Sequence, residues 1–260
     1  MHVNLPKPLH GWRAFVGEVG IIVLGVLIAL GAEQAVQSLH ARTTIKEDTD
    51  ALRREVADHY SFAVEWRVLE PCIAAQIDNL ESRLLESGDK LTPAQLYAEG
   101  SFVYVIRTPE RQYVDGAWQS ALRDGTVSSM SGEIRQQLND HYEQIRQMNQ
   151  ATADIERDVP RLNSLGKPLP LDPSSRLGLF QDLEGLRFRS ANMDLSNGQI
   201  VGDINRLGMV PTIAQASALL RASGTYMFCK SHHLPIRSLR EAVNPLEYSG
   251  TGSPIVRKGP

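Results

Sequence analysis

The stretch Phe15-Val-Gly-Glu-Val-Gly-Ile-Ile-Val-Leu-Gly-Val-Leu-Ile-Ala-Leu-Gly-Ala32 decides the fold of this 260-residue chain. It carries a single charge, that of Glu18, and a helix of about 18 residues just crosses a hydrocarbon core of roughly 30 Å. Trp12 and Arg13 precede it, an aromatic and a basic residue of the kind found at a membrane interface. The sequence therefore predicts a transmembrane helix over residues 14–35.

Small residues in this span offer a surface for packing against another helix. Gly25 and Ala29 form a small-xxx-small pair, and winding the helix at about 100° per residue places Gly17 and Glu18 on the same side. These four residues are the candidates for transmembrane helix packing, although glycine and alanine also occur in spans that do not associate. Glu18 lies about one turn inside the span, so its carboxylate can reach the headgroup layer.

A cleaved signal peptide is an alternative interpretation of the same residues. Lys7 and Arg13 give a positive n-region, and Ala29-Leu-Gly31 offers small residues at a cleavage position. The apolar run is longer than a typical signal-peptide core, which favours a retained anchor. The short tail at residues 1–13 favours a cytoplasmic N-terminus and a periplasmic or extracellular C-terminal part, although the basic residues give only a slight bias.

Gly17-Glu18, an apolar run and then Gly25-Val-Leu-Ile-Ala-Leu30 resemble the start of a family of uncharacterised bacterial single-pass membrane proteins. That family carries a Gly-Glu-apolar-Gly-apolar-Leu-Ile-Ala-Leu signature and then a long helical region. Trp118 to Gly125 resembles a second pattern of the family, whereas Glu33-Gln34 stands where many members have Asn-Trp. The family has no established activity, so the resemblance implies an architecture at the bacterial inner membrane and no mechanism.

The rest of the chain predicts an all-α fold, in which the transmembrane helix continues into a long stalk helix and an antiparallel helical bundle. No Gly or Pro occurs between Ala32 and Pro71, and Pro71 should kink the stalk or start a new helix. The stalk and the first bundle helices are expected over residues 36–88. A heptad-like seam predicts that the stalk packs against another helix, and it consists of Ile45, Thr49, Leu52, Val56, His59, Ala63 and Trp66.

The bundle itself is expected over residues 89–234. Thr92-Pro93 predicts a short helix that ends near Gly100, and Thr108-Pro109-Glu110 predicts a helix that runs to Gly125. Phe102–Ile106 is a strand-like run with no evident partner, so we interpret it as an extended or helical core segment.

The second half of the bundle follows from later helix signals. Ser131 is expected to cap a helix whose seam from Ile134 to Leu162 is long enough to lie antiparallel to the stalk. Further helices are expected over residues 174–207, with a break allowed at Asn197-Gly198, and over residues 213–229. Residues 235–260, which are rich in glycine and proline, are expected to form a flexible C-terminal tail.

Two cysteines, Cys72 and Cys229, lie in the part expected to be exported. In an oxidising compartment a disulfide between them would close a large loop and stabilise the fold by up to roughly 5 kcal/mol. Two unrelated buried thiols are the alternative.

The sequence lacks the motifs of several common catalytic and binding sites. It contains no Gly-x-Ser-x-Gly nucleophile elbow and no phosphate-binding Gly-x-x-x-x-Gly-Lys-Ser/Thr loop. His232-His233 near Cys229 suggests a metal site, but adjacent rings on a helix point about 100° apart, so other ligands would be needed. His59 and His141 lie on the two seams and are interpreted as core residues. We therefore expect no catalytic, cofactor-binding or metal-binding residues.

The net charge of −3 excludes a strongly basic nucleic-acid binder, so no nucleic-acid partner is expected. The leading hypothesis is a non-enzymatic, membrane-anchored scaffold or interaction protein of the bacterial envelope. Its expected partners are the lipid bilayer, an envelope protein and a second copy in a possible homodimer. The alternative is a membrane-anchored small-molecule sensor bundle that acts through a partner.

Overall fold

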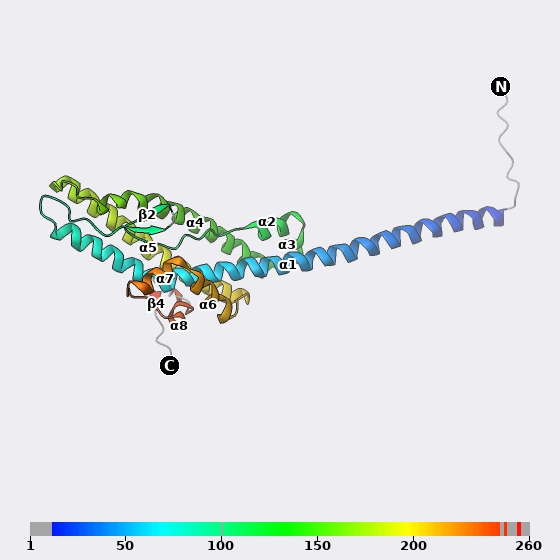
Figure 1. Cartoon of the computed structure of the whole chain (residues 1–260). Coiled ribbons are helices and arrows are strands. Elements are labelled where there is room, and N and C mark those ends of the chain that lie inside the picture. The colour runs from blue at the N-terminus through cyan, green and yellow to red at the C-terminus, as the bar shows by residue number, and fades with distance from the viewer. Residues whose placement is uncertain (1–11, 100, 245–246, 249–253, 256–260) are drawn as a thin grey trace, which may run out of the picture.

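The computed structural model of the chain describes residues 12–99, 101–244, 247–248 and 254–255, and this part has the predicted all-α fold. One long helix projects from the helical bundle and continues into it (Figure 1). The helices are α1 (Trp12–Glu86), α2 (Gly116–Arg123), α3 (Thr126–Ser129), α4 (Gly132–Leu162), the 3-10 helix η1 (Asn163–Gly166), α5 (Pro173–Leu207), α6 (Ile213–Ala222), α7 (Gly224–Ser231) and α8 (Leu239–Ala242). The strands are β1 (Tyr97–Glu99), β2 (Phe102–Tyr104), β3 (Glu247–Tyr248) and β4 (Pro254–Ile255).

The N-terminal part of α1 projects from the bundle as a single helix (Figure 1). Every residue from Phe15 to Thr43 is exposed, and Asp48 is the first buried residue of α1. Among the described residues, α1 is the one helix with a stretch long and apolar enough to cross a membrane, judged by length and composition. The same helix then enters the bundle, where the predicted seam from Leu52 to Trp66 is buried.

Helix α1 continues through Pro71. Of the two outcomes predicted at this proline, a kink or the start of a new helix, the second is therefore wrong. Val68, Leu69, Cys72 and Ile73 are all buried on either side of the proline. Proline costs a helix one hydrogen bond and some steric strain. Burial of these neighbours in the core outweighs that cost, because most helix stability in proteins comes from tertiary packing.

Helices α4 and α5 build the rest of the core. Helix α5 packs against both α1 and α4, and Arg176 near its start contacts the end of α1 while Asp194 contacts Arg67 in the middle. Helix α5 is therefore antiparallel to α1. Helix α4 instead runs in the same direction as α1, so the expectation that it runs back along the stalk is wrong. The reason is that the segment between α1 and α4 has already returned the chain to the end of the bundle from which the N-terminal part of α1 projects (Figure 1).

This returning segment contains less helix than predicted. Phe102–Tyr104 has a partner after all, since β2 pairs antiparallel with β1. The short helix expected from Thr92 is wrong, because the N–H groups of Leu91 and Ala94 donate to the carbonyl oxygens of Leu169 and Leu165. The helix expected from Thr108 begins only at Gly116.

The C-terminal elements pack on the middle of α1. Ser223 divides the single helix expected over residues 213–229 into α6 and α7, and it caps α7 by accepting a hydrogen bond from the N–H of Tyr226. Beyond residue 234, the N–H of Arg237 donates to the carbonyl oxygen of Val68, and Arg67 donates to that of Ala242. The packed part of the chain thus extends to residue 244, past the boundary expected at 234.

Candidate functional site

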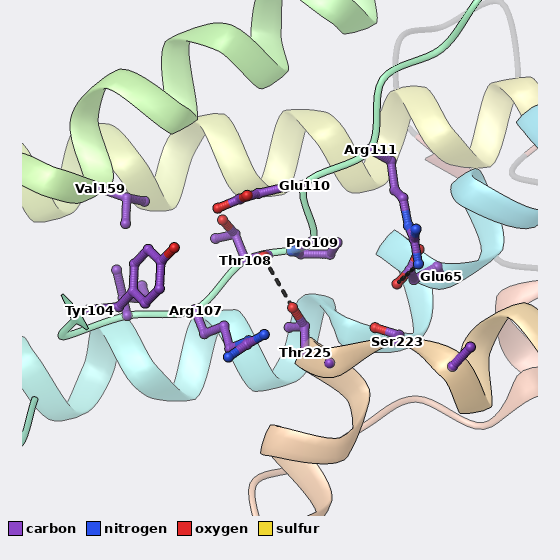
Figure 2. A pocket seen from close by; sticks show the side chains of 13 residues that line it. Glu65, Tyr104, Arg107, Thr108, Pro109, Glu110, Arg111, Val159, Ser223 and Thr225 are labelled. Atoms are coloured by element: carbon purple, nitrogen blue, oxygen red, sulfur yellow. Dashed lines mark hydrogen bonds and ion pairs between the residues drawn. The ribbon is translucent and has the colours of Figure 1, made fainter. Parts of the chain in front are cut away.

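A polar pocket of about 260 Å³ lies where the middle of α1, the end of α4, the start of α7 and the loop before α2 meet (Figure 2). Figure 2 shows Glu65 and Arg111 at one end of this pocket and Tyr104 at the other. Its lining residues are Glu65, Tyr104, Ile106, Arg107, Thr108, Pro109, Glu110, Arg111, Val159, Ala222, Ser223, Gly224 and Thr225. We call it the polar pocket.

The loop that forms one wall is held in an extended form by side chains from distant helices. The amide of Gln76 on α1 accepts from the N–H of Arg107 (2.7 Å) and donates to its carbonyl oxygen (3.1 Å). The hydroxyl of Thr225 donates to the carbonyl oxygen of Thr108 (3.1 Å), and Asn149 bonds both backbone groups of Tyr113. These backbone groups are satisfied without a helix, which explains why the helix signal at Thr108 fails.

The strongest electrostatic feature of the polar pocket is the pair between Glu65 and Arg111. Their side chains are 1% and 35% exposed, and Arg111 Nε and Nη2 donate to the two carboxylate oxygens at 2.7 and 3.2 Å. The guanidinium also lies over the ring of Phe62, 5.5 Å from its centre. A buried carboxylate is stable only with such a partner, so the pair fixes the loop against α1.

The opposite wall is fixed covalently. Cys72 on α1 and Cys229 on α7 form a disulfide with their Cα atoms 6.1 Å apart, and both residues are fully buried. The bond joins positions separated by 157 residues and ties α7, whose first residues line the polar pocket, to the centre of the bundle.

The residues of the polar pocket can bind a small polar molecule through charges and hydrogen bonds. It combines two arginines, two glutamates, and the hydroxyl groups of Thr108, Ser223 and Thr225. None of its lining residues is a His, Cys or Lys, so this pocket holds neither an imidazole base nor a thiol nucleophile. Tyr104, Arg107 and Glu110 all have interactions within the chain.

No metal site emerges among the described residues, where no group of three or more His, Cys, Asp or Glu is placed to hold an ion. The cluster around Cys229 cannot serve, because its sulfur is in the disulfide. His232 Nδ1 lies 3.0 Å from the carbonyl oxygen of Phe228, in the helix that His232 follows.

A second polar cluster lies inside the core and ties the returning segment to α1, α4 and α5. His59 contacts His141 and the carbonyl oxygen of Val114, while the hydroxyl of Tyr113 donates to Asn197 (2.6 Å). The hydroxyl of Tyr142 donates to Glu55 (2.7 Å). Burial raises the pKa of Tyr142 and of Tyr113 well above the usual value of 10.0, so both stay protonated donors.

The four residues proposed for transmembrane helix packing all lie on the exposed part of α1. Among the described residues, no atom outside the helix's own nearby backbone lies within 4 Å of a Cβ added at Gly17 or Gly25, so this part of the chain leaves both positions uncovered. At about 100° per residue, Glu18, Gly25 and Ala29 share one face and Gly17 lies roughly a quarter turn away.

An apolar groove of about 410 Å³ lies at the far end of the bundle from the projecting part of α1, between the end of α1 and the start of α5. Leu85, Leu177 and Phe180 line it. At its edge Arg176 donates to three carbonyl oxygens at the end of α1, those of Leu84, Ser87 and Gly88. This arginine therefore caps α1.

Comparisons with family models, with curated proteins and with solved structures found no match for this chain.

Proposed function

We propose that this chain is a single-pass protein of the bacterial envelope, anchored by residues 14–35, whose helical bundle lies outside the cytoplasm and acts as a non-enzymatic scaffold or interaction module. The continuity of α1 carries this proposal. Its first part is exposed and, from Phe15 to Ala32, apolar except for Glu18, and its second part is the central helix of the bundle. An apolar helix of this length needs a bilayer or a partner to cover it.

The disulfide supports an extracytoplasmic bundle. Disulfides form and persist in oxidising compartments and are rare in the cytosol. Cys72 and Cys229 lie on the C-terminal side of the proposed anchor. The signature from Gly17 to Leu30 supports a place in the uncharacterised family that it resembles, and this membership stays a prediction.

Fractionation and thiol labelling test the anchor and the compartment separately. Washing membranes with alkaline carbonate should leave the full chain in the membrane pellet. When cells are lysed directly into denaturant that contains a maleimide, Cys72 and Cys229 should be labelled only if a reductant has been added first. A chain that washes off contradicts the anchor, and cysteines found reduced in cells contradict the compartment.

A second candidate function is a small-molecule sensor that acts through a partner, and the polar pocket favours it. Glu65 lies on α1, the helix that leads to the proposed anchor, and Thr225 lies on the helix that the disulfide ties to α1. A ligand in this pocket would therefore contact the element that reaches the membrane.

Thermal shift of the full chain against a set of small charged metabolites tests this candidate, because a ligand that binds only the folded state raises the apparent melting temperature. The shift should be lost in Arg107→Gln and kept in Arg157→Gln, an exposed surface control. Equal shifts in both variants, or none with any compound, would argue against a ligand in this pocket.

A further inference from the structure

The exposed part of α1 carries a second seam, distinct from the one that packs into the bundle. Its residues are spaced alternately four and three apart, and they are Gly25, Ala29, Ala32, Val36, Leu39 and Thr43. We call this the membrane-proximal seam. Val36 and Leu39 lie beyond the proposed span, and they are 66% and 62% exposed. An apolar stripe on a single helix in water is stable only if something covers it.

The bundle does not cover this seam, because it packs on the opposite side of α1. At about 100° per residue, Leu39 lies roughly half a turn around the helix from Asp48 and Leu52, which are buried in the bundle. Lys46 and Arg53, which continue the seam toward the C-terminus, are exposed even where the bundle has begun. A partner helix can therefore run along the seam while the bundle stays on the outside.

We infer that a second copy of this chain covers the membrane-proximal seam, as a parallel, in-register pair of α1 helices from Gly25 to Thr43. This inference rests on the proposed membrane anchor, since two copies that share an anchor run parallel. Within the span, Gly25, Ala29 and Ala32 allow the two backbones to approach closely. Val36 and Leu39 then continue the interface into water with the spacing of a coiled coil.

Charge complementarity favours a second copy as the occupant. In a parallel coiled coil, a residue just before one core position pairs with the residue five places further along the partner helix. In this register Arg42 of one copy forms an ion pair with Glu47 of the other. The two-fold symmetry of the dimer gives two such pairs. Both side chains are exposed. Lys46 and Asp50 occupy the next core positions, so the apolar interface ends where the bundle begins.

Cysteine cross-linking in native membranes tests the register directly. The native chain contributes no free thiol, because both of its cysteines are in the disulfide. Single substitutions Val36→Cys, Leu39→Cys and Thr43→Cys should give several-fold more oxidised dimer on a non-reducing gel than the controls. The matched controls are Gln37→Cys, Ser38→Cys and Ala41→Cys, which lie on the outer faces of the same exposed helix.

The proposed ion pair gives a second readout. Arg42→Glu should reduce the cross-linking of Leu39→Cys, and Arg42→Glu combined with Glu47→Arg should restore it. Equal cross-linking at all six positions, or none, in a chain that stays in the membrane pellet would overturn the dimer alone. A chain recovered in the soluble fraction would overturn the membrane anchor and this inference with it.

Discussion

His59 Nδ1 and His141 Nε2 lie 3.0 Å apart inside the bundle, and neither residue is exposed to solvent. His59 Nε2 lies 2.8 Å from the carbonyl oxygen of Val114, which can only accept, so this nitrogen carries the proton. A neutral His59 then accepts at Nδ1, and His141 donates from Nε2. His141 Nδ1 has no hydrogen-bond partner among the described residues. Because neither ring reaches solvent, a charge on either of them is costly, and the neutral pair is the form that burial favours.

Mild acid should destabilise the bundle through this pair. Burial lowers the pKa of His59 from 6.5 to about 4 and that of His141 to about 3. The unfolded chain takes up protons near pH 6.5 and the folded chain does not, so this stability is complete above pH 6.5 and is lost as the pH falls toward 4. For two sites the free energy of unfolding should fall by about 2.7 kcal/mol per pH unit in this window. Urea unfolding across this pH range measures the slope.

Substituting one histidine of the pair checks the assignment. His141→Gln should be less stable at neutral pH, since its hydrogen bond and packing are altered, but its stability should depend about half as steeply on pH between 6.5 and 4. His40→Gln, at an exposed position, should keep the native slope. An unchanged slope in His141→Gln would show that other groups cause the acid sensitivity.

Removing Arg111 should leave the carboxylate of Glu65 buried without its partner. Arg111→Met is expected to lower the free energy of unfolding by about 2–3 kcal/mol, less than for a fully buried pair because Arg111 is 35% exposed. Glu65→Gln in the same chain should recover part of this loss. Arg146→Met, which removes an exposed pair with Glu143, should cost under about 1 kcal/mol. Equal losses at the two arginines in urea unfolding would contradict this account.

The seam on α4 should carry much of the core energy. Leu138 is fully buried, so Leu138→Ala should lower the free energy of unfolding by about 2–5 kcal/mol. Leu138→Asp should prevent stable folding, because it buries an unpaired charge. Leu177→Ala, at a residue that is 58% exposed, should change the stability by less than about 0.5 kcal/mol. A native urea midpoint for Leu138→Ala would contradict the burial of this seam.

Long helices were predictable because their signals are local and repeated. Ser131 caps α4 as expected, accepting from the N–H of Ile134, and the seam that follows is buried from Leu138 to Leu162. Gly208 ends α5 with a positive φ of 66°, which glycine adopts at little cost. The stalk seam also predicted the bundle-facing side of α1 correctly.

The direction of α4 and the polar pocket were not predictable in this way, because they depend on contacts between distant residues. Gln76 fixes the backbone of Arg107, and Asn149 fixes that of Tyr113, so a segment with a helix signal stays extended. Neither amide stands out in the sequence. Glu65, a charge beside the apolar Val64 and Trp66, was a local sign of a buried partner.

The disulfide between Cys72 and Cys229 should contribute a large share of the stability. Because it closes a loop across 157 residues, the chain-entropy model predicts a loss of about 5 kcal/mol in Cys72→Ala/Cys229→Ala. Urea unfolding with and without a thiol reductant measures this loss, and the reductant should have no effect on the double variant. Loss of the bond should also speed amide exchange at the start of α7, where Gly224 and Thr225 line the polar pocket. A reductant that leaves the native midpoint unchanged would mean that the packing of α7 on α1 suffices without the bond.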